Sequence, residues 1–172
     1  AYRLTGNVNN DLPMIRLLGS GPILKNVISA SEDLNRRGIT TEIWSVTSYG
    51  ELRREGLEFE RIKRFDPKHE GVPYVEACFG DGVPTVAASD YIAAVPEMIQ
   101  RWMKGEFLPL GTDGFGRSDT REELRRFFEV DSDSIVLASI SLLERQGAIP
   151  PGSSASFAEE AGLSYERKDV TL

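Results

Sequence analysis

Short apolar segments alternate along this chain with longer segments in which apolar residues recur every three or four positions. Residues 14–18 (MIRLL) are followed directly by the turn 19–21 (GSG), which predicts a strand. Over 22–37 the apolar residues keep the spacing of one buried helical face, and 41–46 (TEIWSV) predicts a second strand. A strand, a helix and a strand in this order place two parallel strands side by side through a right-handed crossover. The order of segments therefore indicates an α/β fold.

The rest of the chain continues this alternation. Further strands are predicted over 85–89 and 107–111, with helices before, between and after them. One helix is expected to begin at Ser48, whose Ser-x-x-Glu pattern is a capping box, to break at Gly56 and to resume over 57–65. Further helices are expected along the apolar face of 92–102, after a cap at Asp119 or Thr120, from the cap Asp131 to Gly147, and near 155–161. The segment 74–79 suits a helix or a strand equally. These elements predict a doubly wound α/β sheet.

Length and composition fit one folded domain. The 172 residues suffice for a single core, expected over about 13–147 with a tail over 148–172, but are few for two domains. A net charge of −7, from 27 acidic and 20 basic residues, repels phosphate backbones and argues against nucleic acid as a partner. No apolar run is long enough for a bilayer, and the first residues lack the features of a signal peptide, so no membrane contact is expected. With Cys78 as the one cysteine, a cytoplasmic location is expected.

The turn at 19–24 (GSGPIL) lies where a dinucleotide-binding fingerprint would lie, after a strand and at the start of a helix. Leu24 replaces the third glycine of that fingerprint, and 45–47 (SVT) offers no acidic residue for a ribose at the end of the second strand. A structural turn is the favoured interpretation, and a weak anion site at this turn is the alternative.

Gly80-Asp81-Gly82 resembles the start of the motif that holds Mg²⁺ and thiamine diphosphate. That motif requires an asparagine further downstream, and this chain has none after Asn35. The motif also leads into a helix, whereas a strand is predicted to follow here. A hairpin-like surface turn is the better interpretation.

The remaining reactive residues receive no catalytic or metal-binding role. The only histidine, His69, lies in a charged loop, so neither a histidine-based metal site nor a Ser-His-Asp triad has supporting residues. Cys78 lies among apolar residues and is interpreted as a small buried side chain rather than a nucleophile. Arginines and glutamates are interleaved over 51–64, which predicts a solvated, ion-paired helix face.

The segment 113–119 (DGFGRSD) is the candidate site. It is dense in glycine and charge and follows a predicted strand, where α/β proteins bind ligands. Its arginine suits a carboxylate or phosphate from a partner segment. A structural role, in which the glycines meet backbone demands and two polar residues cap a helix, is nevertheless favoured. The candidate residues for an interface or an active-site entrance are Asp113, Phe115, Arg117, Ser118 and Asp119.

Four blocks of the sequence point to a family. They cover 17–24, 44–52, 86–91 and 110–121, and the last block, LGTDGFGRSDTR, is the most specific. In this order and spacing they resemble the C-terminal domain of the homodimeric, bacterial-type pyruvate dehydrogenase E1 component, a transketolase-like domain. The resemblance implies a three-layer, doubly wound α/β domain with a mostly parallel five-stranded sheet.

The resemblance also implies a division of labour. The whole enzyme would decarboxylate pyruvate with thiamine diphosphate and Mg²⁺, and then reductively acetylate the lipoyl group of E2, the dihydrolipoyl acetyltransferase. In that family the cofactor lies between the first two domains of opposite subunits, so no catalytic, cofactor-binding or metal residue is carried over to this chain. The isolated domain is expected to be inactive and to pack against the remaining E1 domains and the second E1 subunit. Two alternatives stay open: a stand-alone anion- or protein-binding module, and a docking domain for E2.

Overall fold

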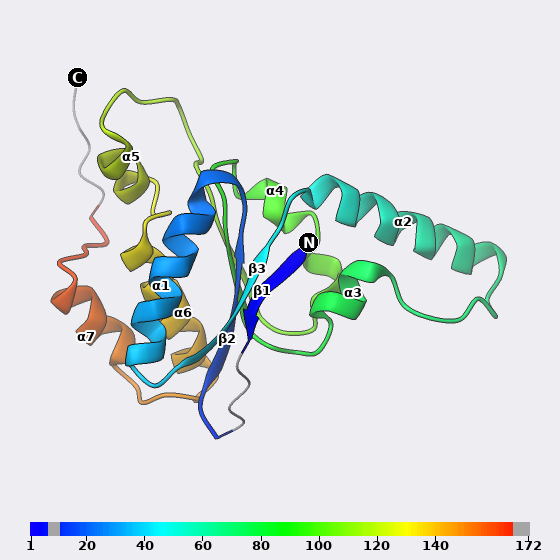
Figure 1. Cartoon of the computed structure of the whole chain (residues 1–172), viewed down its shortest axis with the longest axis horizontal. Helices are drawn as coiled ribbons and strands as arrows, with labels where there is room; N and C mark the ends of the chain where they lie inside the picture. Colours follow the sequence, from blue (N-terminus) through cyan, green and yellow to red (C-terminus); the bar gives the residue numbers. More distant parts are fainter. Residues whose placement is uncertain (7–10, 167–172) are drawn as a thin grey trace.

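The computed structural model describes residues 1–6 and 11–166 and shows a five-stranded sheet between two layers of helices (Figure 1). The strands lie in the order β1-β3-β2-β4-β5. Four of them are parallel, and β1 runs antiparallel to β3 at one edge. The expected three-layer, mostly parallel sheet is therefore confirmed. The strands are β1 (Tyr2–Gly6), β2 (Met14–Gly19), β3 (Thr40–Ser45), β4 (Thr85–Ala88) and β5 (Phe107–Leu110).

The helices divide between the two faces of the sheet. They are η1 (Gly21–Ile23), α1 (Leu24–Arg36), α2 (Tyr49–Phe65), α3 (Tyr74–Phe79), α4 (Ala94–Glu97), η2 (Gln100–Trp102), α5 (Arg121–Phe127), α6 (Ser132–Arg145) and α7 (Ser153–Glu160). One face is covered by α1 and α6, with α7 packed on α6, and the other by α2, α3 and η2 (Figure 1). The chain passes from β3 to β4 across β2, so the segments after β2 and β4 leave toward opposite faces.

Each face of the sheet has its own apolar core. Side chains alternate between the faces along β2, so Ile15 and Leu17 enter the first core and Leu18 the second. The first core joins β2 to α1 and α6, and the helical face predicted over 22–37 is fully buried in it. Phe157 of α7 also belongs to this core, although it lies in the segment expected to be a tail. The second core contains Leu18, Val46, Tyr49, Leu52, Val75, Phe79, Ala87, Ile99 and Trp102.

The prediction that Gly56 breaks the second helix is wrong, because α2 is continuous over Tyr49–Phe65. Gly56 is buried, and a Cβ at this position would lie 2.5 Å from Cζ2 of Trp102. The glycine therefore lets the helix approach the indole ring closely, and its role concerns packing rather than termination.

A buried cation, Arg16, lies in the middle of β2 and is 1% exposed. Its Nε donates to Oε2 of Glu42 on β3 at 2.5 Å. Its two terminal nitrogens donate to the two carboxylate oxygens of Asp81 at 2.9 and 2.6 Å, which lowers the pKa of Asp81. Arg3 of β1 completes the chain of charges, since its Nε lies 3.0 Å from Oε1 of Glu42. The expectation of a hairpin-like turn at 80–82 is therefore corrected: the turn joins α3 to the parallel strand β4, and its carboxylate neutralises a buried cation.

Three predicted helix caps are confirmed. Ser48, Thr120 and Asp131 each accept a hydrogen bond from the backbone nitrogen three residues later, at 3.1, 3.3 and 3.1 Å. Thr120 rather than Asp119 therefore starts α5. The short helix α7 has no capping side chain of its own. Instead, Glu144 of α6 accepts hydrogen bonds from the backbone nitrogens of Gly152 and Ser154 at the start of α7, at 2.6 and 2.8 Å. Hydrogen bonding by the side chain of Ser154, and then by these backbone nitrogens, lowers the pKa of this carboxylate.

Three segments differ from or complete the sequence-based expectations. The edge strand β1 was not predicted from its five residues. The undecided segment 74–79 is the helix α3. The single helix expected along 92–102 is divided into α4 and η2, and several backbone bonds there span three residues rather than four, which is the tighter 3₁₀ pattern.

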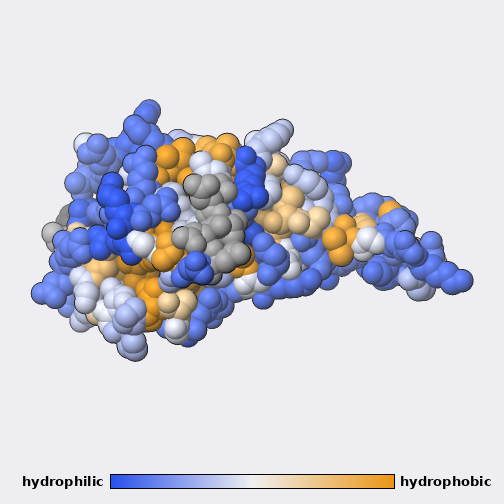
Figure 2. All heavy atoms as spheres, turned by 60° about the horizontal axis from the view of Figure 1, so that its bottom comes forward, coloured by the Kyte–Doolittle hydropathy of each residue, from blue (hydrophilic) through white to orange (hydrophobic). Residues whose placement is uncertain are grey.

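Helix α2 forms an arm that projects from the body (Figure 1). Its surface is mostly hydrophilic with a small apolar patch, seen on the right of Figure 2. The predicted ion-paired face is confirmed by the pairs Arg54–Glu51 and Arg61–Glu58, and Arg101 of η2 reaches Glu60 at 3.0 Å. None of the helices in the described residues combines the length and the apolar character needed to cross a bilayer.

Candidate functional site

A pocket of about 540 Å³ lies at the carboxyl ends of the strands. The crossing of the chain past β2 makes β2 and β4 a topological switch point, and such a point opens a crevice because the following segments diverge. We call this cavity the switch-point pocket. Its wall comes from the segment after β2 (Pro22, Ile23), from the segments after β4 and β5 (Asp90, Thr112, 114–117), and from α5 and the residues that follow it (Arg121, Leu124, Arg125, Phe128, Val130).

The glycine turn after β2 packs against the residues that follow β4. Ser20 and Ser89, which follow β2 and β4, are buried and joined by a hydrogen bond of 2.8 Å between their hydroxyl oxygens. Gly21 has a φ of +54°, and a Cβ there would lie 2.9 Å from Oδ1 of Asp90. A side chain at position 21 would thus be strained and would collide with the Asp90 carboxylate. Gly19 is needed for a different reason, since a Cβ there would lie 2.8 Å from Cδ1 of Leu24 where the helix packs on the strand.

The loop after β5 is tied to the loop after β4. The backbone nitrogen of Thr112 donates to the carbonyl oxygen of Tyr91 at 2.9 Å, and its hydroxyl donates to the carbonyl oxygen of Asp90 at 2.8 Å. Asp113 accepts from the backbone nitrogen of Ala93 at 3.1 Å. These bonds hold the start of the glycine-rich segment at the mouth of the pocket.

The structure separates the five candidate residues of segment 113–119 into two groups. Phe115 and Arg117 line the pocket, and Phe115 is 96% exposed. Asp113, Ser118 and Asp119 do not line it. Asp113 braces the loop as described above, and Asp119 accepts from the backbone nitrogen next to it at 2.7 Å. A role for the segment in contact with a partner or in an active-site entrance stays a prediction.

Three arginines at intervals of four residues, Arg117, Arg121 and Arg125, give the pocket its positive charge. Arg117 lies over the ring of Phe127, 3.8 Å from its centroid, and Arg125 donates to Oδ1 of Asn26 at 3.3 Å. Within the described part of the chain, none of the three forms an ion pair with a carboxylate. The sequence interpretation singled out Arg117 alone, although the four-residue spacing was visible and would have found the other two.

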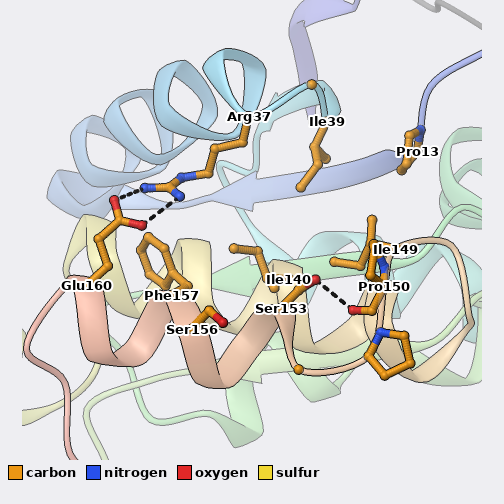
Figure 3. A pocket seen from close by; sticks show the side chains of 13 residues that line it. Pro13, Arg37, Ile39, Ile140, Ile149, Pro150, Ser153, Ser156, Phe157 and Glu160 are labelled. Carbon is orange, nitrogen blue, oxygen red and sulfur yellow. Dashed lines mark hydrogen bonds and ion pairs between the residues drawn. The ribbon is translucent and has the colours of Figure 1, made fainter.

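A second cavity, of about 530 Å³, lies at the amino ends of β2 and β3, between the end of α1, α6 and α7 (Figure 3). Its charged residues pair with each other: the guanidinium of Arg37 donates to both oxygens of Glu160 at 3.1 and 2.6 Å. This contact raises the pKa of Arg37 and lowers that of Glu160. Arg37 also lies over the ring of Phe157. The cavity therefore has no free charge in its wall, in contrast to the switch-point pocket.

Three residues that the sequence analysis weighed for a catalytic or metal-binding role, Asp81, His69 and Cys78, lie outside both pockets. Asp81 of the Gly-Asp-Gly turn uses both carboxylate oxygens on Arg16, so this turn does not fit a metal-bound pyrophosphate. His69 packs against Phe59, with 5.2 Å between the ring centroids. Cys78 is half-buried, less enclosed than expected. No group of three or more metal-ligating side chains occurs in residues 1–6 and 11–166.

The sequence of this chain is similar to those of known proteins. Residues 1–131 match the family model described as a transketolase-like TK C-terminal domain. The pyruvate dehydrogenase E1 component of Pseudomonas aeruginosa is 43% identical over 159 residues, which are 90% of this chain and 18% of that protein. The protein of the same name from Escherichia coli K12 is 41% identical over 138 residues, 78% of this chain and 15% of that protein.

Solved structures agree on the fold. Transketolase from Leishmania mexicana superimposes with a TM-score of 0.57 at 22% identity and covers 90% of this chain and 20% of its own. Transketolase from Campylobacter jejuni gives a TM-score of 0.51 at 15% identity, over 81% of this chain and 18% of its own. The chain thus spans less than a fifth of the two curated relatives and about a fifth of the solved structures.

Proposed function

The chain belongs to the family of transketolase-like C-terminal domains, and from this membership we propose that it is the C-terminal domain of a pyruvate dehydrogenase E1 component. The observation that carries the proposal is the Pseudomonas aeruginosa relative, which is 43% identical over 90% of this chain and yet extends far beyond it. In this proposal all 172 residues form one domain of a longer enzyme.

The whole enzyme would decarboxylate pyruvate and pass the acetyl group to the lipoyl group of E2. Thiamine diphosphate and Mg²⁺ would be held by the other domains of E1. Asp81 supports this division, because it belongs to the sole Gly-Asp-Gly of the sequence and its carboxylate is committed to the buried Arg16.

The domain itself would pack against the other E1 domains and the second subunit. Exposed apolar side chains gather in two places, which is typical of surfaces that other protein covers. Phe65, at the end of the α2 arm, and Val72, in the segment that returns beside α2, are 81% and 51% exposed. Tyr91 and Ile92, near the carboxyl ends of the strands, are 60% and 50% exposed.

Deleting this region from the full-length enzyme tests the packing role. We expect loss of the dimer, measured by light scattering after gel filtration, and loss of pyruvate-dependent ferricyanide reduction in the presence of thiamine diphosphate and Mg²⁺. Phe65→Ser is expected to weaken the dimer, whereas the matched control Arg64→Ser, which changes a neighbouring exposed residue without a recorded ion pair, should leave it unchanged. A truncated enzyme that stays dimeric and fully active would overturn the packing role.

The isolated chain provides the test of where the chemistry lies. With pyruvate, thiamine diphosphate and Mg²⁺ it is expected to release no carbon dioxide. Turnover by the isolated chain would contradict the assignment of the cofactor to other domains.

A further inference from the structure

We propose that the switch-point pocket binds a small molecule that carries a phosphate group and hydroxyl groups. This inference goes beyond the proposed function and does not depend on it, because it rests on the charge and shape of the pocket alone.

The charge of the pocket calls for an anion. Arg121 and Arg125 lie one helical turn apart on α5, and like charges at this spacing repel each other. Several other arginines of the described residues pair with carboxylates, as Arg37 does with Asp33 and Glu160. Within the described residues Arg121 has no carboxylate partner, and Asp90, which shares the pocket, lies beyond ion-pair distance of all three pocket arginines. An entering dianion would bring the missing negative charge to this local group of arginines.

The backbone of the pocket is open to a ligand in the loop after β5. Gly114 of this loop lines the pocket and has a φ of +110°. No atom lies within 4 Å of where a Cβ of Gly114 or Gly116 would be, so the main chain of this loop is accessible. Pro22 and Ile23, which follow the glycine turn after β2, line the same cavity as this loop.

The remaining wall selects what accompanies the phosphate. The Asp90 carboxylate beside Gly21 accepts no hydrogen bond from the described residues, and it suits a ligand hydroxyl. Ile23 and Phe128 supply an apolar surface next to it. A cavity of about 540 Å³ holds a small organic phosphate rather than a bare ion.

Titration calorimetry with three probes tests the proposal: inorganic phosphate, glycerol 3-phosphate and glycerol. We expect saturable one-to-one binding of glycerol 3-phosphate with a dissociation constant at or below about 1 mM, weaker binding of inorganic phosphate, and no binding of glycerol. Binding should weaken as salt is added, because the contact is electrostatic.

Charge-removing variants locate the site. Arg121→Gln is expected to weaken glycerol 3-phosphate binding by about tenfold or more, and Asp90→Asn to reduce the preference for glycerol 3-phosphate over inorganic phosphate. The matched control Arg53→Gln removes an exposed arginine of α2, and binding should be unchanged. Thermal unfolding of each variant confirms that it folds; Arg121 is exposed, so its replacement leaves the core intact. Absence of saturable binding up to about 10 mM, or an equal loss in Arg121→Gln and Arg53→Gln, would overturn the proposal.

Discussion

Replacing Gly56 by alanine sets helix propensity against packing. In the middle of a helix alanine is favoured over glycine by about 1 kcal/mol, so propensity alone predicts stabilisation. The structure predicts the opposite, because the new Cβ would lie 2.5, 2.7 and 2.9 Å from three ring atoms of Trp102. Real carbon atoms do not approach this closely, so α2 or the indole ring would have to move.

The size of the effect follows from these two terms. Inserting a methyl group into a well-packed core costs about 1–3 kcal/mol, and a contact with a rigid ring belongs at the upper end. Since Trp102 is 6% exposed and buried in the second core, it has little room to turn away. After subtraction of the propensity gain, Gly56→Ala is expected to lower the free energy of unfolding by about 1–2 kcal/mol.

Gly50 offers a matched control in the same helix. A Cβ at this position would meet nothing closer than Oγ of Ser48, at 3.8 Å, so Gly50→Ala is expected to be neutral or to stabilise by up to about 1 kcal/mol. Urea unfolding followed by tryptophan fluorescence measures both variants, and Trp102 reports directly on the contact. If Gly56→Ala were as stable as the Gly50→Ala variant, the close packing of α2 on Trp102 would be refuted.

Four further substitutions test the buried charges and one buried hydroxyl. Arg16→Met is expected to lower the free energy of unfolding by about 3 kcal/mol, because it removes the buried cation that pairs with the buried Glu42. Arg3→Met removes a half-exposed partner of the same carboxylate and should lower it by less than about 1 kcal/mol. Equal losses in urea unfolding would contradict this ranking. Since Arg16 holds the pKa of Asp81 below its ordinary 3.8, the stabilisation from the ionised carboxylate is complete above that value and disappears as the pH falls through the lower folded pKa. The stability difference between wild type and Asp81→Asn should therefore be largest near neutral pH and shrink in acid; a constant difference would count against the ion pair. Tyr49→Phe is expected to be neutral or to stabilise by up to about 1 kcal/mol in thermal unfolding, because the buried hydroxyl has no hydrogen-bond partner among the described residues and its burial raises its pKa. A clear loss of stability would contradict this account.

Local signals were enough for most of the fold. β4 was predicted over 85–89 and spans Thr85–Ala88, and the caps Ser48 and Asp131 start α2 and α6 as expected. Each of these signals lies within a few residues of the structure it specifies. β1 was missed because its five residues carry only a brief alternation, and its place depends on pairing with β3.

Features that depend on distant residues were out of reach. The role of Gly56 is defined by Trp102, and the partners of Arg16 lie 26 and 65 positions away. The same limit applies to the candidate site. The sequence indicated the turns at 19–24 and 113–119 separately, but the crossing of the chain past β2 is what makes them two sides of one pocket.

The buried Arg16 also bears on how β2 finds its alignment between its neighbours. Nearly all other side chains of β2 are apolar, so hydrophobicity alone distinguishes its two faces poorly. A slip by one residue would turn the guanidinium toward α1 and α6, into a core without a carboxylate. Only the native alignment brings it to both Glu42 and Asp81. The charge of Arg16 thus specifies one alignment of the central strand. Its removal would permit other alignments and would also lower stability.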